Sequence, residues 1–209
     1  MAVRRVIPFM FLKESNLYLR LLGFEDRSYS NGPGRRAVVW TQGCTLNCPG
    51  CFNPDSHSPD AGFKVSVRSL VERIVSAEGE IDGITISGGE PLQQWTAIEV
   101  LVRRIRRETG LSIILFTGYT WQEISRRIAI LPSGSNRCSW LDCVDVLISG
   151  RFIEQQRVAR GLAGSRNKQF HFLTDRHQKK DFENVPEAEV VIGPEGDLLL
   201  TGIDPLRWE

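Results

Sequence analysis

The sequence predicts a single α/β domain of 209 residues, an incomplete parallel (β/α) barrel with a C-terminal β-hairpin extension. Short apolar runs alternate with segments of helical periodicity, a pattern typical of parallel strands joined by right-handed helical crossovers. The strands are too few for a closed eightfold barrel, so we expect an open, partial one. A core of this size can bury roughly 70% of the surface that the unfolded chain exposes, which fits one domain. We place its core at about 17–168 and its extension at about 169–209.

Each expected strand is a short apolar run bounded by turn residues. The five runs that satisfy this pattern in the core are 17–24, 37–41, 84–86, 112–116 and 144–149.

Three helices are expected between these strands. Ser66 is a candidate N-cap for a helix that ends near Gly79, and the pair Thr120 and Glu123 has the spacing of a capping box for a helix through about residue 130. The third helix covers 95–109, with its arginines largely on the outer face.

The pattern changes after Arg151. Residues 155–168 are polar and contain glycine, and 176–180 is interpreted as a basic loop that includes His177. Strand signals return at 189–192 and 198–201, which predicts a hairpin with a turn longer than two residues.

Composition excludes several function classes. Charged residues make up 24% of the chain and the net charge is +1, so we expect neither a nucleic-acid nor a membrane-surface partner. The apolar stretch in residues 1–13 is under half of the roughly 20 residues that a membrane span requires. Five cysteines without a secretory signal favour reduced thiols or metal ligation over disulfides, and therefore a cytoplasmic protein.

Three cysteines form the first candidate site. Cys44, Cys48 and Cys51 have C-x3-C-x2-C spacing on a loop that follows an apolar strand. Structural zinc requires four ligands, and the nearest further candidate is His57. A 4Fe-4S cluster held by only three thiolates keeps one iron open for another ligand. The spacing alone favours the cluster but leaves a zinc-stapled binding module as an alternative.

A glycine turn forms the second candidate site. Ser87, Gly88, Gly89 and Glu90 follow the next expected strand, about 40 residues after the cysteines. Ligands bind α/β folds at the carboxyl ends of strands, and glycines allow a close approach of backbone to ligand. The two patterns together are far more specific than either one.

With these motifs the sequence resembles the radical S-adenosylmethionine superfamily, and within it the small activating proteins of anaerobic ribonucleotide reductase, the 4Fe-4S single-cluster family. The resemblance runs from about 17 to 167 through NGPGRRAVVWTQGCTLNCPGCFNP, SGGEPL, FTGYTWQEI and DVLISGRFIEQQ. It implies a radical-SAM-type partial barrel and two cofactors, a 4Fe-4S cluster on Cys44, Cys48 and Cys51 and S-adenosyl-L-methionine on the fourth iron.

The resemblance also implies cofactor-binding residues. The turn from Ser87 to Glu90, with Gly88 and Gly89, would bind the methionyl amino group, and the backbone around Phe52 would touch adenine. Thr117, Ser149 and Arg151 complete the expected set. The family commonly has an aspartate where this chain has Ser149, and Gly164-Ser165-Arg166-Asn167-Lys168-Gln169 also departs from the family pattern. No catalytic residue is expected beyond the cluster and the cofactor.

By the same resemblance, reductive cleavage of S-adenosylmethionine would give a 5'-deoxyadenosyl radical that abstracts hydrogen from a polypeptide partner. An external one-electron reductant such as flavodoxin or ferredoxin would supply the electron. A glycyl radical enzyme is the first candidate partner, and a ribosomally synthesised precursor peptide is the alternative. Cys138 and Cys143 are interpreted as structural, because two cysteines make an incomplete metal site.

Overall fold

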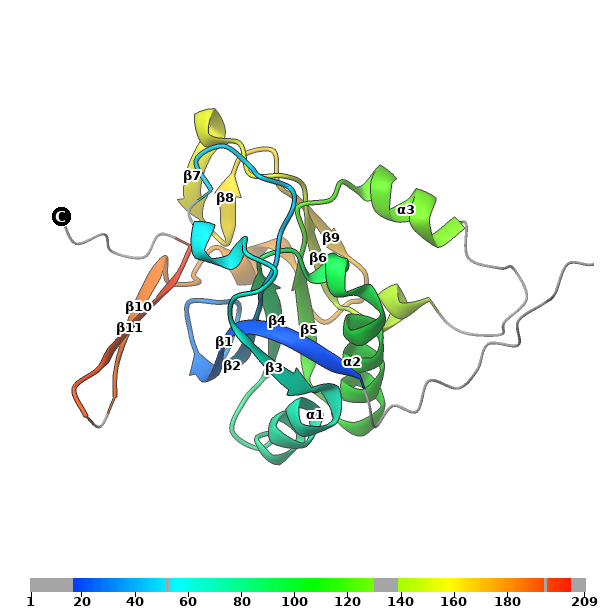
Figure 1. Ribbon diagram of the computed structural model, residues 1–209, viewed down its shortest axis with the longest axis vertical. Helices are drawn as coiled ribbons and strands as arrows, with labels where there is room; N and C mark the ends of the chain where they lie inside the picture. Colours follow the sequence, from blue (N-terminus) through cyan, green and yellow to red (C-terminus); the bar gives the residue numbers. More distant parts are fainter. Residues whose placement is uncertain (1–16, 52, 130–138, 194, 204–209) are drawn as a thin grey trace, which may run out of the picture.

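A computed structural model describes residues 17–51, 53–129, 139–193 and 195–203. Its centre is a mixed seven-stranded sheet with the strand order β3-β1-β2-β4-β5-β6-β9 (Figure 1). The strands are β1 (Tyr18–Ser28), β2 (Arg36–Thr41), β3 (Phe63–Ser66), β4 (Gly83–Gly88), β5 (Ser112–Phe116), β6 (Val146–Ser149) and β9 (Gln169–Phe172).

The expectation of a parallel sheet is confirmed only for the four central strands. β2, β4, β5 and β6 are parallel, whereas β1 is antiparallel to both β2 and β3, and β9 is antiparallel to β6. A parallel pair needs a crossover of a dozen or more residues. Residues 29–35 between β1 and β2 are too few, and between β6 and β9 the chain forms a small hairpin instead of a helix. The result is a parallel centre with antiparallel edges.

The three expected helices are present as α1 (Val67–Ser76), α2 (Trp95–Glu108) and α3 (Trp121–Ala129). The Ser66 hydroxyl accepts a hydrogen bond from the backbone N–H of Ser69 at 3.0 Å, which confirms the N-cap of α1. The capping box of α3 is confirmed as well. The Thr120 N–H donates to the Glu123 carboxylate at 2.7 Å, and the Glu123 N–H donates to the Thr120 hydroxyl at 3.3 Å.

The larger core lies between one face of the sheet and the helices α1 and α2, which pack against each other (Figure 1). Successive strand residues point to opposite faces, so alternate residues of each strand contribute to this core. Its fully buried members from the helices and the neighbouring strands include Leu21, Val39, Val71, Ile74, Ile84, Ile86, Leu101, Val102, Ile105, Ile113, Leu115 and Leu147.

The opposite face of the sheet is covered by the chain that follows β6. Ile114, Val146 and Ile148 on this face are buried against Leu162, Phe182 and Val185, which come from residues 150–185. The C-terminal part of the chain therefore packs on the core sheet and supplies its second apolar layer.

Arg36 is fully buried on this second face. Its guanidinium donates to the hydroxyls of Thr85 and Ser112 and to the carbonyls of Pro33, Ile84 and Ser112, at 2.6 to 3.1 Å. Burial lowers its pKa to about 9, while the charges of two aspartates act in the opposite sense. The arginine thus joins three strands at the amino ends of the parallel strands.

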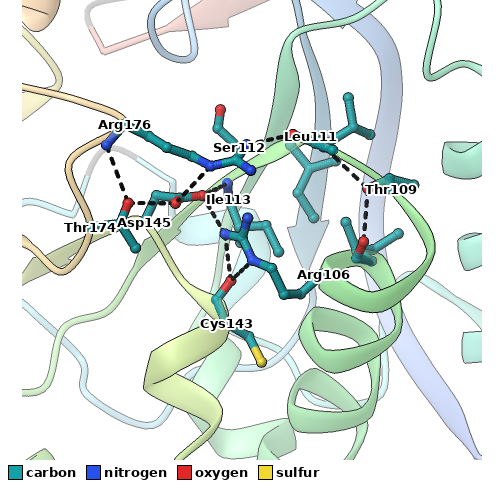
Figure 2. Close-up of polar contacts among 12 residues, drawn as sticks. Arg106, Thr109, Leu111, Ser112, Ile113, Cys143, Asp145, Thr174 and Arg176 are labelled. Atoms are coloured by element: carbon teal, nitrogen blue, oxygen red, sulfur yellow. Dashed lines mark hydrogen bonds and ion pairs between the residues drawn. The ribbon is translucent and has the colours of Figure 1, made fainter.

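A second buried charge, that of Asp145, lies just before β6, and Figure 2 shows its polar contacts. The Asp145 carboxylate accepts hydrogen bonds from the guanidinium of Arg106 at 2.5 Å, the hydroxyl of Thr174 at 2.6 Å and the N–H of Ile113 at 2.7 Å. Arg106 also donates to the carbonyl of Cys143. The backbone carbonyl of Cys143 therefore belongs to a network that joins α2, β5 and β6, while the role of its thiol stays a prediction.

The remaining elements are short. The expected loop at 155–168 contains a small hairpin of β7 (Arg157–Arg160) and β8 (Ala163–Ser165), and β3 was not expected either. The expected C-terminal hairpin is confirmed as β10 (Ala188–Ile192) and β11 (Leu198–Gly202). It projects from the body of the molecule in Figure 1. The 3-10 helices are η2 (Pro54–Ser56), η3 (Pro91–Gln94), η4 (Trp140–Cys143), η5 (Glu154–Gln156) and η6 (Lys179–Phe182).

Several sequence-based expectations concern residues outside the described ranges: the apolar stretch in 1–13, the adenine contact at Phe52, and Cys138. In the ranges that are described, no helix combines the length and the apolar character needed to cross a membrane.

Candidate functional site

The cysteine loop begins directly after β2, at the carboxyl end of the parallel strands, and returns to the sheet at β3. Its two limbs are joined by backbone hydrogen bonds from Gly43 to Ser56 and from Cys44 to His57, at 2.8 and 3.0 Å. The side-chain amide of Gln42 donates to two further carbonyls of the returning limb. The loop is therefore held by its own chain before any metal binds.

Gln93 joins this loop to the neighbouring strands. Its side-chain carbonyl accepts from the backbone N–H of Thr45 at 3.1 Å, and its amide donates to the Thr45 hydroxyl at 2.8 Å. The same amide donates to the Tyr119 hydroxyl at 3.3 Å. Sequence reasoning missed Gln93, because nothing in its local pattern distinguishes it from other polar residues after a turn.

A cavity of about 410 Å³ lies beside the loop. This volume is within the range of small-molecule sites. Side chains of Cys44, Cys48 and Cys51 contribute to its wall, and so does the turn from Ser87 to Glu90. Residues from the C-terminal hairpin also line it, namely Leu199, Leu200, Thr201, Gly202 and Ile203. The structure thus brings the two sequence motifs to one cavity.

Cys44, Cys48 and Cys51 are all partly buried. Burial raises the pKa of the Cys44 thiol and of the Cys51 thiol, and the neighbouring cysteines act in the same direction. A metal that binds thiolates must therefore displace protons from both groups.

The glycines of the second motif are explained by backbone packing against the cysteine loop. A Cβ atom on Gly88 would lie 2.3 Å from the backbone of Thr41, and one on Gly89 would lie 2.5 Å from the carbonyl oxygen of Gly43. Two backbone hydrogen bonds hold this contact: the Gly89 N–H donates to the Thr41 carbonyl, and the Glu90 N–H donates to the Gly43 carbonyl. Gly88 also has a φ of +104°, a conformation that favours glycine. The two motifs are thus one packed unit.

Glu90 is fully buried and holds the turn to the end of β5. One carboxylate oxygen accepts from the N–H of Leu92 at 2.9 Å and from the hydroxyl of Thr117 at 2.8 Å. The other accepts from the N–H of Gly118 at 2.7 Å. Burial raises the pKa of Glu90, although these three hydrogen bonds oppose the shift. Glu90 and Thr117 both line the cavity.

Lys168 also lines the cavity, although the sequence indicated only that its segment departs from the family pattern. It lies on the segment between β8 and β9, and its ammonium donates to the carbonyl of Gly150. Burial lowers its pKa, while the negative charges of Glu90, Cys48 and Cys51 act in the opposite direction. The polar segment around it gave no local signal, because these partners are far from Lys168 in the sequence.

Ser149 and Arg151 have other partners. The Ser149 hydroxyl shares a hydrogen bond of 2.9 Å with the ring of His171. The Arg151 guanidinium makes two hydrogen bonds of 2.9 Å to the Glu123 carboxylate and lies 5.9 Å from the ring centroid of Tyr119. Neither residue belongs to the lining of the cavity.

These features suit an iron-sulfur cluster with one open iron. Each thiolate of such a cluster binds its own iron, whereas the ligands of zinc must converge on one ion. Three cysteines on the wall of a ligand-sized cavity are therefore candidate ligands of a cluster beside a candidate small-molecule site.

Comparison with known proteins identifies the family. Residues 30–171, more than half of the chain, match the 4Fe-4S single cluster domain family. The chain therefore belongs to the 4Fe-4S single cluster domain family. The matched range contains the three cysteines, the Ser87 to Glu90 turn and Lys168, but not the β10–β11 hairpin.

Several relatives carry the name anaerobic ribonucleoside-triphosphate reductase-activating protein. The protein from Escherichia coli K12 is 29% identical over 150 residues, which cover 68% of this chain and 92% of that protein. The Vibrio cholerae protein is 31% identical over 154 residues, 69% of this chain and 92% of that protein. A pyruvate formate-lyase-activating enzyme from Staphylococcus aureus is 37% identical over 92 residues, 42% of this chain and 36% of that enzyme.

These relatives confirm the resemblance to radical S-adenosylmethionine activating proteins. The 4Fe-4S cluster and S-adenosylmethionine are accordingly the cofactors of this family, as expected. The family match supports the cluster over the zinc alternative. The individual ligand and cofactor-binding residues remain predictions.

Proposed function

We propose that this chain activates a glycyl radical enzyme of the kind that its relatives are named for, an anaerobic ribonucleotide reductase. The observation that carries the proposal is one cavity lined by Cys44, Cys48, Cys51 and the Ser87 to Glu90 turn, in a chain of the activating-protein family. In this proposal the core sheet acts as a radical-SAM-type partial barrel, with the core at about 17–168 and the extension at 169–209 in one domain.

The three cysteines would hold the cluster and leave one iron for the methionyl group of the cofactor. When bound, the cluster and S-adenosylmethionine would together supply one-electron reductive cleavage of the sulfonium C–S bond, which would release methionine and leave a carbon radical able to take a hydrogen atom from a C–H bond of the partner polypeptide. The protein holds the cysteine loop through Gln93 and the glycine turn through Glu90. A flavodoxin or ferredoxin in the cytoplasm would supply the electron.

The C-terminal hairpin supports a second candidate, a radical enzyme that modifies a ribosomally synthesised peptide. The hairpin lies beyond the family match, yet five of its residues or neighbours line the cavity. It is fixed by Glu189, whose carboxylate accepts from the Ser28 hydroxyl at 2.6 Å and from the Tyr29 N–H at 2.9 Å. A free strand edge beside a cavity can bind an extended peptide.

Electron paramagnetic resonance separates these two functions. The reconstituted protein is mixed anaerobically with S-adenosylmethionine, dithionite and either the anaerobic ribonucleotide reductase or a precursor peptide encoded beside its gene. A persistent glycyl doublet on the reductase supports activation, and a mass change on the peptide supports modification. The Cys48→Ala protein is the control that should give neither signal.

A further inference from the structure

The wall of the cavity carries one strongly basic group. Among the lining residues in the described ranges, Lys168 is the only lysine or arginine, and Glu90 is the only aspartate or glutamate. An ammonium group is costly to bury unless an anion or several acceptors surround it. The surroundings of Lys168 therefore indicate which ligand group it would face.

The protein alone gives Lys168 little compensation. An ammonium has three donors, and the hydrogen bond that it makes within the described part of the chain is to the Gly150 carbonyl. Glu90, Cys48 and Cys51 are the negative groups that act on it. The Glu90 carboxylate already accepts three hydrogen bonds from Leu92, Thr117 and Gly118. Lys168 consequently retains donors for a bound anion.

The segment that carries Lys168 is fixed in place. Its own backbone N–H donates to the Ser165 carbonyl at 3.1 Å. The preceding Asn167 donates to the carbonyl of Arg151 at 2.8 Å and accepts from the Ser165 hydroxyl at 2.6 Å. A lysine on a fixed segment loses less conformational freedom when a ligand binds.

Arg151, the basic residue that the sequence suggested for the cofactor, is committed elsewhere. Glu123 holds both terminal nitrogens of its guanidinium, in a bidentate pair that is stronger than a single contact. This pair lowers the pKa of Glu123 to about 2. The cavity therefore receives its positive charge from the β8–β9 segment rather than from the end of β6.

We propose that Lys168 binds the methionyl carboxylate of S-adenosylmethionine, with Arg151 acting only on structure. The inference rests on the proposed function. The sulfonium and the amino group of the cofactor would be repelled by, or indifferent to, an ammonium, and adenine is uncharged. The carboxylate is the one anionic group of the cofactor, so it is the group that a partly buried ammonium would select.

Three ligands test this assignment on the cluster-loaded protein, without reductant, so that binding is measured in the absence of turnover. S-adenosylmethionine and S-adenosylhomocysteine both carry the carboxylate, whereas 5'-methylthioadenosine lacks the whole amino-acid part. Lys168→Met should weaken binding of the first two by about 10- to 100-fold, the loss typical of a charged hydrogen bond. Binding of 5'-methylthioadenosine should be unchanged. Lys168→Arg should restore part of the affinity.

Lys64→Met is the matched control, because Lys64 is an exposed lysine on β3 and is not among the residues that line the cavity. It should leave all three affinities unchanged. Equal affinities of wild type and Lys168→Met for S-adenosylmethionine overturn this inference alone. Equal losses for all three ligands, or a loss of iron, also overturn it and assign Lys168 to the cluster. A wild-type protein that carries the cluster but binds no S-adenosylmethionine overturns the proposed function, and this inference with it.

Discussion

Glu90 offers the sharpest test of how the site is built. Its buried carboxylate accepts three hydrogen bonds, two of them from the backbone N–H groups of Leu92 and Gly118, which lose this acceptor when the side chain is removed. Each buried donor left without a partner costs about 1–3 kcal/mol. Glu90→Ala should therefore lower the free energy of unfolding by about 2–6 kcal/mol, while the Thr117 hydroxyl can rotate to another partner.

Glu90→Gln is the more discriminating variant. It keeps the size of the side chain but turns one acceptor oxygen into an NH2 group that faces a donor. We expect a loss of about 1–3 kcal/mol, because at least one hydrogen bond is replaced by a contact between two donors.

Urea unfolding of the metal-free protein under anaerobic conditions measures both values. Glu99→Gln is the control, since Glu99 forms a partly exposed i,i+4 pair with Arg103 and should contribute under about 1 kcal/mol. If Glu90→Gln unfolded at the same urea concentration as Glu99→Gln, the carboxylate would not hold the turn. Binding of S-adenosylmethionine by the folded variants then measures any separate effect on the cofactor.

Three further outcomes are expected. Cys48→Ala should abolish both the brown colour of the reconstituted protein and its cleavage of S-adenosylmethionine, whereas Cys143→Ala should retain both; iron analysis and product chromatography test this pair. Arg36→Lys should lower the free energy of unfolding by about 2–6 kcal/mol, because lysine has three donors for the five hydrogen bonds of the arginine; a urea midpoint equal to that of wild type would contradict this. Glu123 has a folded pKa of about 2, below its usual value of 4.5, so the stability from its pair with Arg151 is present above about pH 4.5 and lost as the pH falls toward 2. Because the pair is partly exposed, it should contribute under about 1 kcal/mol. Glu123→Gln keeps the capping geometry, so the difference in unfolding free energy between wild type and this variant should shrink as the pH falls over that range. A difference that stays constant would show that the charge of Glu123 is not responsible.

Local signals explain why much of the fold could be predicted. Ser66 and the pair Thr120 and Glu123 cap helices through contacts within three residues, so the sequence contains the whole interaction. The antiparallel direction of β1 was missed, although the lack of a helix between the first two apolar runs indicates it. The β7–β8 hairpin was also missed. In β7 only Ala159 is buried, and β8 has just three residues, so neither strand shows the alternation that predicts a strand.

The residues of the candidate site were likewise predicted only in part from the sequence. Cys44, Cys48 and Cys51 lie within eight residues of each other, so the sequence alone displays their spacing. The roles of Lys168 and Ser149 depend on tertiary contacts. Ser149 contacts His171 only because of the antiparallel register of β6 and β9, and the sequence of neither strand indicates that register. The approach of Gly88 and Gly89 to a ligand stays a prediction, and the structure adds a second requirement for them, because they pack on the backbone of Thr41 and Gly43.

The central claim is that the three cysteines and the adjoining cavity form a site for reductive cleavage of S-adenosylmethionine. The most direct measurement is the release of 5'-deoxyadenosine and methionine by the anaerobically reconstituted protein after addition of dithionite. The account predicts a brown protein with about four irons per chain that releases both products in equal amounts. A colourless protein that carries stoichiometric zinc and releases neither product would contradict it.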